Sequence, residues 1–247
     1  MICLFPARLL RIDPVLRNAD LALPNPAGAG TGELDRYKRE DRSLHVCLAW
    51  SEHRRYSLAY LRKQESALSL RGDITYLDAK GKPRKDPTRG RTEDPAPETN
   101  ERIRKRGLTS LRRYMAENTS GRIFIGGKRT GSTGDWPDLV EKAVFALEAD
   151  QPIYLAGGFG DMTLDMIRIF DIDDCTGFVP LPDKPIPGMA WNDGLERLEQ
   201  IREEKGGKLP DNGLDDRENR QLASTHRPSE IAALISLGLG RIFSGAR

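Results

Sequence analysis

Apolar residues along the chain fall into short runs and into longer segments with helical spacing. Compact apolar runs bounded by polar residues or glycine predict strands, because such runs fill the interior of a sheet. These runs lie at 44–50, 73–77, 121–125 and 152–156. Apolar residues spaced three or four apart predict amphipathic helices. The predicted helices span 56–70, 99–118, 137–149, 162–170, 191–204, 215–223 and 228–243.

The middle of the chain repeats one order of elements twice. The strand at 121–125 runs into a glycine-rich turn, Gly126–Gly134, and a helix follows with Pro137 in its first turn. The strand at 152–156 runs into a second turn, Gly157–Gly160, and again a helix follows. This alternation is typical of a parallel sheet covered by helices, so the predicted fold class is α/β.

The first 40 residues have a different pattern. An apolar patch at 2–10 is followed by several prolines and by a glycine-rich stretch that ends at Gly32. Because proline and glycine interrupt regular structure, no strand or helix of normal length is predicted here. We therefore divide the chain into a divergent or truncated N-terminal segment, 1–40, and one domain, 41–247.

Composition excludes several classes of protein. Hydrophobic residues make up 38% of the chain, charged residues make up 31%, and the mean hydropathy is −0.56. These values are typical of a water-soluble protein. No apolar run approaches the roughly 18 residues of a membrane-spanning helix, and the N-terminus lacks the basic-then-apolar order of a secretory signal. We expect a cytoplasmic protein that makes no contact with a membrane.

Cysteine and histidine are too few and too scattered to indicate a disulfide framework or a metal site. Cys3, Cys47 and Cys175 form no Cys-x-x-Cys pair, and the three histidines form no His-Glu-x-x-His motif. The expectation is a domain with no metal, no cofactor and no catalytic histidine.

Positive charge is concentrated in one part of the chain, although the net charge is only +2. The stretch 80–113 holds twelve basic and five acidic residues, a local net charge of +7. Its first part, 80–100, has four prolines and almost no apolar residues, which predicts a flexible surface loop. Such a basic stretch could bind nucleic acid or a phosphate-bearing ligand. Since no aromatic residue within 80–100 offers a stacking surface, nucleic acid is the less favoured partner.

The two glycine turns carry the candidate chemistry. A glycine turn between a parallel strand and a helix gathers main-chain amides and the positive end of the helix dipole, and this arrangement binds phosphate. Lys128 and Thr130 add a cation and a hydroxyl to the first turn. That turn lacks the Gly-Lys-Ser/Thr spacing of a P-loop and the spacing of a dinucleotide fingerprint. Tight packing of the chain is an equally good explanation for either turn.

Glu141 lies one turn into the helix that follows the first glycine turn. The apolar stripe of this helix includes Leu139 and Val144, and the spacing predicts Glu141 roughly opposite that stripe, outside the core. A carboxylate there could accept hydrogen bonds from ribose hydroxyls. It could equally be a favourable charge near a helix N-terminus, which is worth about 0.3–1 kcal/mol.

Several separated motifs follow one another along the chain. They are Leu48-Ala-Trp50, Leu111-Arg-Arg-Tyr-Met115, Arg122-Ile-Phe-Ile-Gly-Gly-Lys128, Trp136-Pro137, Glu141-Lys-Ala, Gln151-Pro-Ile-Tyr-Leu-Ala-Gly-Gly-Phe-Gly160 and Asn212–Leu222. In this order they resemble the SLOG superfamily, a group of Rossmann-like domains that includes the Smf/DprA and LOG proteins. The similarity covers about 44–243 and is closest to the ligand-sensing branch of bacterial anti-phage and nucleotide-signalling systems. Members of this family open with a strand, a helix and a second strand that residues 1–40 do not show.

The resemblance implies a Rossmann-like three-layer sandwich with a mainly parallel central sheet. It also implies a sensor that binds a nucleotide-derived ligand, such as ADP-ribose or an NAD-derived signal, and that self-associates as a homo-oligomer. By motif position, a basic residue of the Arg112/Arg113 pair, Lys128 and Glu141 would contact the ligand. The full set of predicted ligand-binding residues is Arg112, Arg113, Gly126, Gly127, Lys128, Thr130, Gly131, Glu141, Gly157, Gly158, Phe159 and Gly160.

Two other functions remain open. An enzyme of LOG type, a phosphoribohydrolase, would cleave a nucleotide N-glycosidic bond, with Glu141 stabilising the ribosyl transition state. The LOG motif Pro-Gly-Gly-x-Gly-Thr-x-x-Glu is spaced more tightly than its nearest equivalents here, which argues against catalysis. A DprA-like protein would bind DNA through the basic stretch 80–113, and the scarcity of aromatic residues argues against that.

Overall fold

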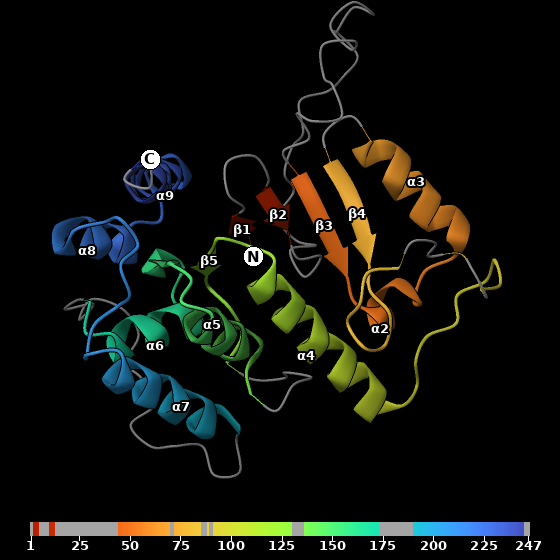
Figure 1. The fold of residues 1–247 in the computed structure, drawn as a ribbon, viewed down its shortest axis with the longest axis horizontal. Coiled ribbons are helices and arrows are strands. Elements are labelled where there is room, and N and C mark those ends of the chain that lie inside the picture. The colour runs from red at the N-terminus through yellow and green to blue at the C-terminus, as the bar shows by residue number, and fades with distance from the viewer. Residues whose placement is uncertain are drawn as a thin grey trace, which may run out of the picture. The chain divides into compact units, whose positions relative to one another are not determined.

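The computed structural model describes residues 2–4, 10–12, 44–69, 72–84, 88, 91–129, 136–172 and 190–244. The chain divides into two compact units, Met1–Met115 (unit 1) and Ala116–Arg247 (unit 2). Figure 1 shows their helices and strands. Within the described ranges, no helix is long and apolar enough to cross a membrane.

Unit 1 contains four neighbouring strands in the order β4-β3-β2-β1. Their bounds are Ile2–Leu4 (β1), Leu10–Ile12 (β2), Leu44–Leu48 (β3) and Gly72–Tyr76 (β4). β1 pairs with β2 antiparallel, whereas β2 with β3 and β3 with β4 are parallel. The two three-residue strands β1 and β2 were not predicted, because runs this short carry no periodicity that a sequence pattern can detect.

Helices cover both faces of β3 and β4 and make unit 1 a three-layer structure. The helices are α2 (Trp50–His53), α3 (Leu58–Leu68) and α4 (Glu101–Glu117). Successive strand residues point to opposite faces of a sheet. Leu48 accordingly packs in one cluster with Leu58 and Leu61 of α3, and Cys47 packs in another with Leu111 and Met115 of α4.

In the described part of unit 2, two parallel strands lie among helices. The strands are β5 (Gly121–Ile125) and β6 (Ile153–Ala156), with Ile123 opposite Tyr154. The helices are α5 (Asp138–Glu148), the 3₁₀ turn η3 (Gly157–Phe159), α6 (Asp161–Ile169), α7 (Ala190–Glu204), α8 (Asp216–Ser224) and α9 (Pro228–Ser244). α7 packs on α5 and α6, while α8 packs on β6 and η3. All four residues of β6 are buried, as expected of a strand with both faces covered.

The α/β class and the mainly parallel strand pairing are confirmed. Each predicted strand and helix occurs, with ends that differ by a few residues. The placement of Pro137 inside a helical turn was wrong. Pro137 is the residue before α5 and has extended dihedral angles, φ −52° and ψ 140°.

Candidate functional site

The two glycine turns lie together at one edge of the β5–β6 pair. Each turn follows the carboxyl end of its strand, and because the strands are parallel neighbours, both ends lie at the same edge. A Cβ atom built on Gly126 would lie 3.9 Å from the Cβ atom of Phe159. We call the residues Gly126–Lys128 and Phe159–Gly160 the glycine edge.

Hydrogen bonds tie the first turn to the start of α6. The amide of Met162 donates to the Gly127 carbonyl at 3.1 Å, and the amide of Thr163 donates to the Gly126 carbonyl at 2.9 Å. The Thr163 hydroxyl donates to the same Gly126 carbonyl at 2.7 Å. Amides in the first turn of a helix usually need a partner from outside the helix. Here the carbonyls of Gly126 and Gly127 are those partners, so the amides of Met162 and Thr163 are not available to a ligand.

The backbone of the first turn requires glycine. Gly126 and Gly127 have φ angles of 58° and 101°, in the left-handed region that side chains disfavour. A Cβ atom on Gly127 would also lie 2.1 Å from Cδ1 of Leu139. The amides of Gly127 and Lys128 donate to no other described residue. The first turn therefore combines a fixed backbone with two main-chain donors that a ligand could use.

The second turn is covered by the chain itself along half of its length. Cβ atoms on Gly157 and Gly158 would lie 2.4 Å from the Ala223 carbonyl oxygen and 2.2 Å from the Thr225 carbonyl oxygen. Both carbonyls belong to the end of α8 and the residues after it. At Gly160, in contrast, a Cβ atom would meet nothing within 4 Å. Gly157 and Gly158 thus serve close packing, and only the Phe159–Gly160 end of this turn is open.

Charged side chains beside the first turn have separate roles. Lys128 is exposed, and its ammonium forms no ion pair with another residue in the described ranges. Arg129 donates from Nε and Nη2 to the two carboxylate oxygens of Asp165 at 2.7 and 2.9 Å. This hydrogen bonding raises the pKa of Arg129, and Asp165 is fully buried on α6. Arg129 therefore anchors the turn, while Lys128 is the cation that a ligand can reach.

Asp165 is the residue at this edge that sequence reasoning missed. It stands between Leu164 and Met166 on the buried side of α6. An acidic residue within an apolar helical stripe was the available signal, because buried carboxylates need a cationic or hydrogen-bonding partner. The partner, however, lies 36 residues away in the chain.

The expectation that Glu141 lies outside the core was wrong. Glu141 is only 5% exposed, and the adjacent Lys142 is 3% exposed. α5 packs against α6 and α7 as well as against β5 and β6, so all five residues from Val140 to Val144 are buried. The spacing correctly identified one apolar stripe but contained no information about helices that pack on the other faces of α5.

The remaining predicted ligand residues belong to unit 1 or lie outside the described residues. Arg112 and Arg113 lie on α4, in unit 1, whereas the glycine turns belong to unit 2. Arg112 is buried and Arg113 is exposed. Thr130 and Gly131 lie outside the described residues.

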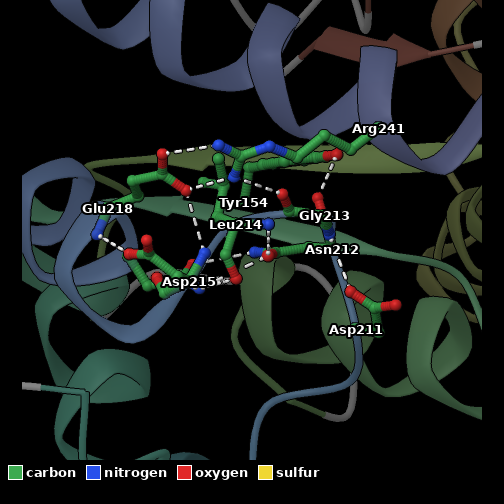
Figure 2. Close-up of polar contacts among 9 residues, drawn as sticks. Tyr154, Asp211, Asn212, Gly213, Leu214, Asp215, Glu218 and Arg241 are labelled. Carbon is green, nitrogen blue, oxygen red and sulfur yellow. Dashed lines mark hydrogen bonds and ion pairs between the residues drawn. The ribbon is translucent and has the colours of Figure 1, made fainter.

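A polar network behind β6 holds α8 and α9 in place (Figure 2). The hydroxyl of Tyr154 donates to the Asn212 carbonyl at 2.8 Å, and burial raises the pKa of Tyr154. The buried Asn212 side chain donates to the Ile153 carbonyl at 3.0 Å and accepts from the Leu214 amide at 3.0 Å. Residues 212–214 are thereby fixed against strand β6.

The same network reaches both C-terminal helices. Asp215 and Glu218 form a capping box at the start of α8. Arg241 of α9 donates to Glu218 and to the Gly213 carbonyl, both at 3.0 Å (Figure 2). Because this network holds α8 and α9 together, it also positions the Ala223 and Thr225 carbonyls that cover the second glycine turn.

A cavity of about 290 Å³ lies beside this network, between 170–172 and 207–220. Asn212 and Asn219 are among its lining residues, and the Asn212 side chain donates to Asn219 at 2.8 Å. The Asn219 side chain also donates to the Leu214 carbonyl at 3.1 Å. These amide groups are used by the fold, so the cavity is a weaker candidate than the glycine edge.

Parallel strands, glycine turns at their carboxyl ends and covering helices define a Rossmann-like α/β protein. The family model of SLOG cluster2 matches residues 33–176, more than half of the chain, and the chain therefore belongs to this family of the SLOG superfamily. The matched range includes both glycine turns and ends before α7. Searches of curated proteins and of solved structures found no significant match.

Proposed function

We propose that the protein binds a nucleotide-derived ligand at the glycine edge and acts as a sensor of that ligand. The observation that carries this proposal is the meeting of the two glycine turns at the carboxyl ends of neighbouring parallel strands. Ligands of open α/β sheets bind at this end of the strands. Membership of the SLOG superfamily supports a nucleotide-related ligand.

Three groups at the edge suit the parts of such a ligand. The Gly127 and Lys128 amides and the Lys128 ammonium suit a phosphate, since main-chain donors and a cation together stabilise its charge. Phe159 is 49% exposed beside Gly126 and offers a surface on which a base can stack. The proposed ligand is ADP-ribose or another product of NAD, and ligand binding is read out through self-association of the chain.

Binding of ADP-ribose to the purified protein tests the site. We expect ADP-ribose to raise the melting temperature, and Lys128→Ala and Phe159→Ala each to weaken binding about tenfold by calorimetry, the effect of losing one charged contact or one stacked base. Lys63→Ala on α3 is the matched control, because Lys63 is exposed and belongs to unit 1. Unchanged affinity in both edge variants would reject the site.

Light scattering with and without ADP-ribose tests the sensor role. We expect the molar mass of the particle to change on binding in the wild type and not in Lys128→Ala.

Chromatography tests for catalysis after the protein is incubated with ADP-ribose, NAD or AMP. If the wild type releases free base and Glu141→Gln does not, the sensor proposal would be rejected in favour of a hydrolase of LOG type.

A further inference from the structure

Three arginines gather around Trp50 and His53 in unit 1. The guanidinium carbons of Arg54 and Arg84 lie 4.7 and 5.2 Å from the centre of the Trp50 ring. Nη1 of Arg91 lies 3.0 Å from Nδ1 of the buried His53. We call Arg54, Arg84 and Arg91 the arginine cluster. Its members come from the end of α2, from the residues after β4 and from the segment before α4, so the fold and not local sequence brings them together.

Two of these arginines bind to uncharged groups. Nε of Arg54 donates to the Ala96 carbonyl at 2.9 Å. Nη2 of Arg91 donates to the Tyr56 carbonyl at 2.8 Å, and its Nη1 faces the His53 imidazole. These contacts orient the guanidinium groups without neutralising them.

Two of the described carboxylates nearby in the sequence are paired with other arginines. Glu52 lies 3.4 Å from Arg55, and Glu93 lies 3.2 Å from Arg62. Burial, together with the positive charges of Arg54 and Arg84, lowers the pKa of Arg91. The positive charges of Arg54 and Arg84 thus repel that of Arg91, and a bound anion would relieve this repulsion.

His53 holds Arg91 as a neutral acceptor. Its Nε2 lies 3.0 Å from the Leu77 carbonyl, so Nε2 carries the hydrogen and Nδ1 is left to accept from Arg91. The Trp50 and Tyr76 rings pack edge-on against the imidazole. The guanidinium of Arg91 is therefore held in position before any ligand arrives.

We propose that the arginine cluster binds the phosphate group of a small molecule, separately from the ligand of the glycine edge. Guanidinium groups match phosphate oxygens with paired donors, and Arg54, Arg84 and Arg91 are each only partly buried, so solvent and small anions can reach them. Stacking of Arg54 and Arg84 on Trp50 limits the number of orientations that these two side chains adopt.

A small molecule fits the cluster better than a nucleic acid strand does. Strand binding combines a track of cations with aromatic faces that are open to the bases. Here Arg54 and Arg84 lie over the Trp50 ring, and Tyr56 and Tyr60 stack on each other with ring centres 4.8 Å apart. The described aromatic rings of this region are thus already engaged within the protein.

Calorimetry with inorganic pyrophosphate at low salt tests the proposal. The titrations use the Lys128→Ala protein, in which the glycine edge is weakened. We expect binding that falls about tenfold or more in Arg84→Gln and in Arg91→Gln, the effect of losing one charged hydrogen-bond donor. Arg55→Gln is the matched control, since Arg55 follows Arg54 directly but is exposed and paired with Glu52. Circular dichroism confirms that each variant is folded.

Each outcome decides the proposal. Absence of pyrophosphate binding, or equal affinity in Arg84→Gln and Arg91→Gln, would overturn it. Tighter binding of a single-stranded DNA oligomer than of pyrophosphate, lost in the same variants, would replace the small molecule by nucleic acid. Because Lys128 is already substituted, loss of the arginine site and loss of the ADP-ribose site are measured independently.

Discussion

At the glycine edge of unit 2, main-chain amides of Gly127 and Lys128 join two side chains as the groups that suit a ligand, whereas in the arginine cluster of unit 1 all of these groups belong to side chains. These main-chain donors are fixed by packing and by glycine, so their geometry depends on what fits beside Gly127, just as the second glycine turn depends on what fits beside Gly158. Guanidinium donors are fixed by hydrogen bonds to His53, Tyr56 and Ala96. The first kind of site is sensitive to added volume, and the second kind is sensitive to charge.

Gly158→Ala should have the largest effect on stability. Its Cβ atom would lie 2.2 Å from the Thr225 carbonyl oxygen and 2.7 Å from the His226 amide nitrogen, so main chain must move. We expect a loss of about 3 kcal/mol in the free energy of unfolding, measured by urea denaturation. Gly240→Ala on α9 is the control, because a Cβ atom there meets nothing within 4 Å and alanine favours a helix. Equal stability of the two variants would contradict the packing role of Gly158.

Lowering the pH should destabilise the region around the arginine cluster. The pKa of His53 falls from 6.5 to about 4, mainly because the side chain is buried. The hydrogen bond to the Leu77 carbonyl raises this pKa, whereas the positive charges of Arg91, Arg84 and Arg54 lower it. The folded state therefore favours the neutral imidazole. The resulting stability is complete above pH 6.5, decreases as the pH falls towards 4, and amounts to roughly 2–3 kcal/mol.

Urea denaturation at several pH values between 7 and 4.5 measures this effect. In His53→Gln, the free energy of unfolding should decrease over this pH range by roughly 2–3 kcal/mol less than in the wild type. A variant with the same pH dependence as the wild type would show that His53 does not control it. Lys128→Ala should leave the pH dependence unchanged, since the glycine edge contains no described histidine.

Asp165→Asn should have a moderate effect that reaches the glycine edge. The substitution removes the charge that pairs with Arg129, whose side chain is 24% exposed, and we expect a loss of about 2 kcal/mol in the free energy of unfolding. ADP-ribose affinity should also fall, because Arg129 no longer anchors the first turn. Asp193→Asn, an exposed position in the first turn of α7, is the control for both measurements. If Asp165→Asn lowers stability but leaves ADP-ribose affinity intact, the ion pair does not position the turn.

Much of the fold could be predicted from the sequence because its elements have strong local signals. The apolar runs of β3, β5 and β6 and the helical spacing of α4 and α5 gave the correct element types. β1 and β2 could not be found, since three residues are too few to show a period. Glu141 was misplaced for a different reason: one helix has several faces, and only packing with α6 and α7 decides which of them are buried.

The candidate site was predictable only in part. Glycine turns after parallel strands indicated the edge. The sequence does not distinguish a glycine that leaves space for a ligand from a glycine that leaves space for another segment of main chain. The carbonyls that cover Gly157 and Gly158 come from Ala223 and Thr225, more than 60 residues further along. The arginine cluster had no local signal, because its parts stand at 50–54, 84 and 91 and meet only in the fold.

The segment that joins α8 to α9 packs directly on Gly157 and Gly158, main chain against main chain, with no side chain of these two glycines in between. A side chain can absorb a small displacement by changing its rotamer, but two main chains in van der Waals contact must shift as one body. A ligand that displaces Phe159 or Gly160 would therefore also move the start of α9. Helices α8 and α9, which follow the family match, would in this way change position when the ligand binds, and a binding partner could detect that change.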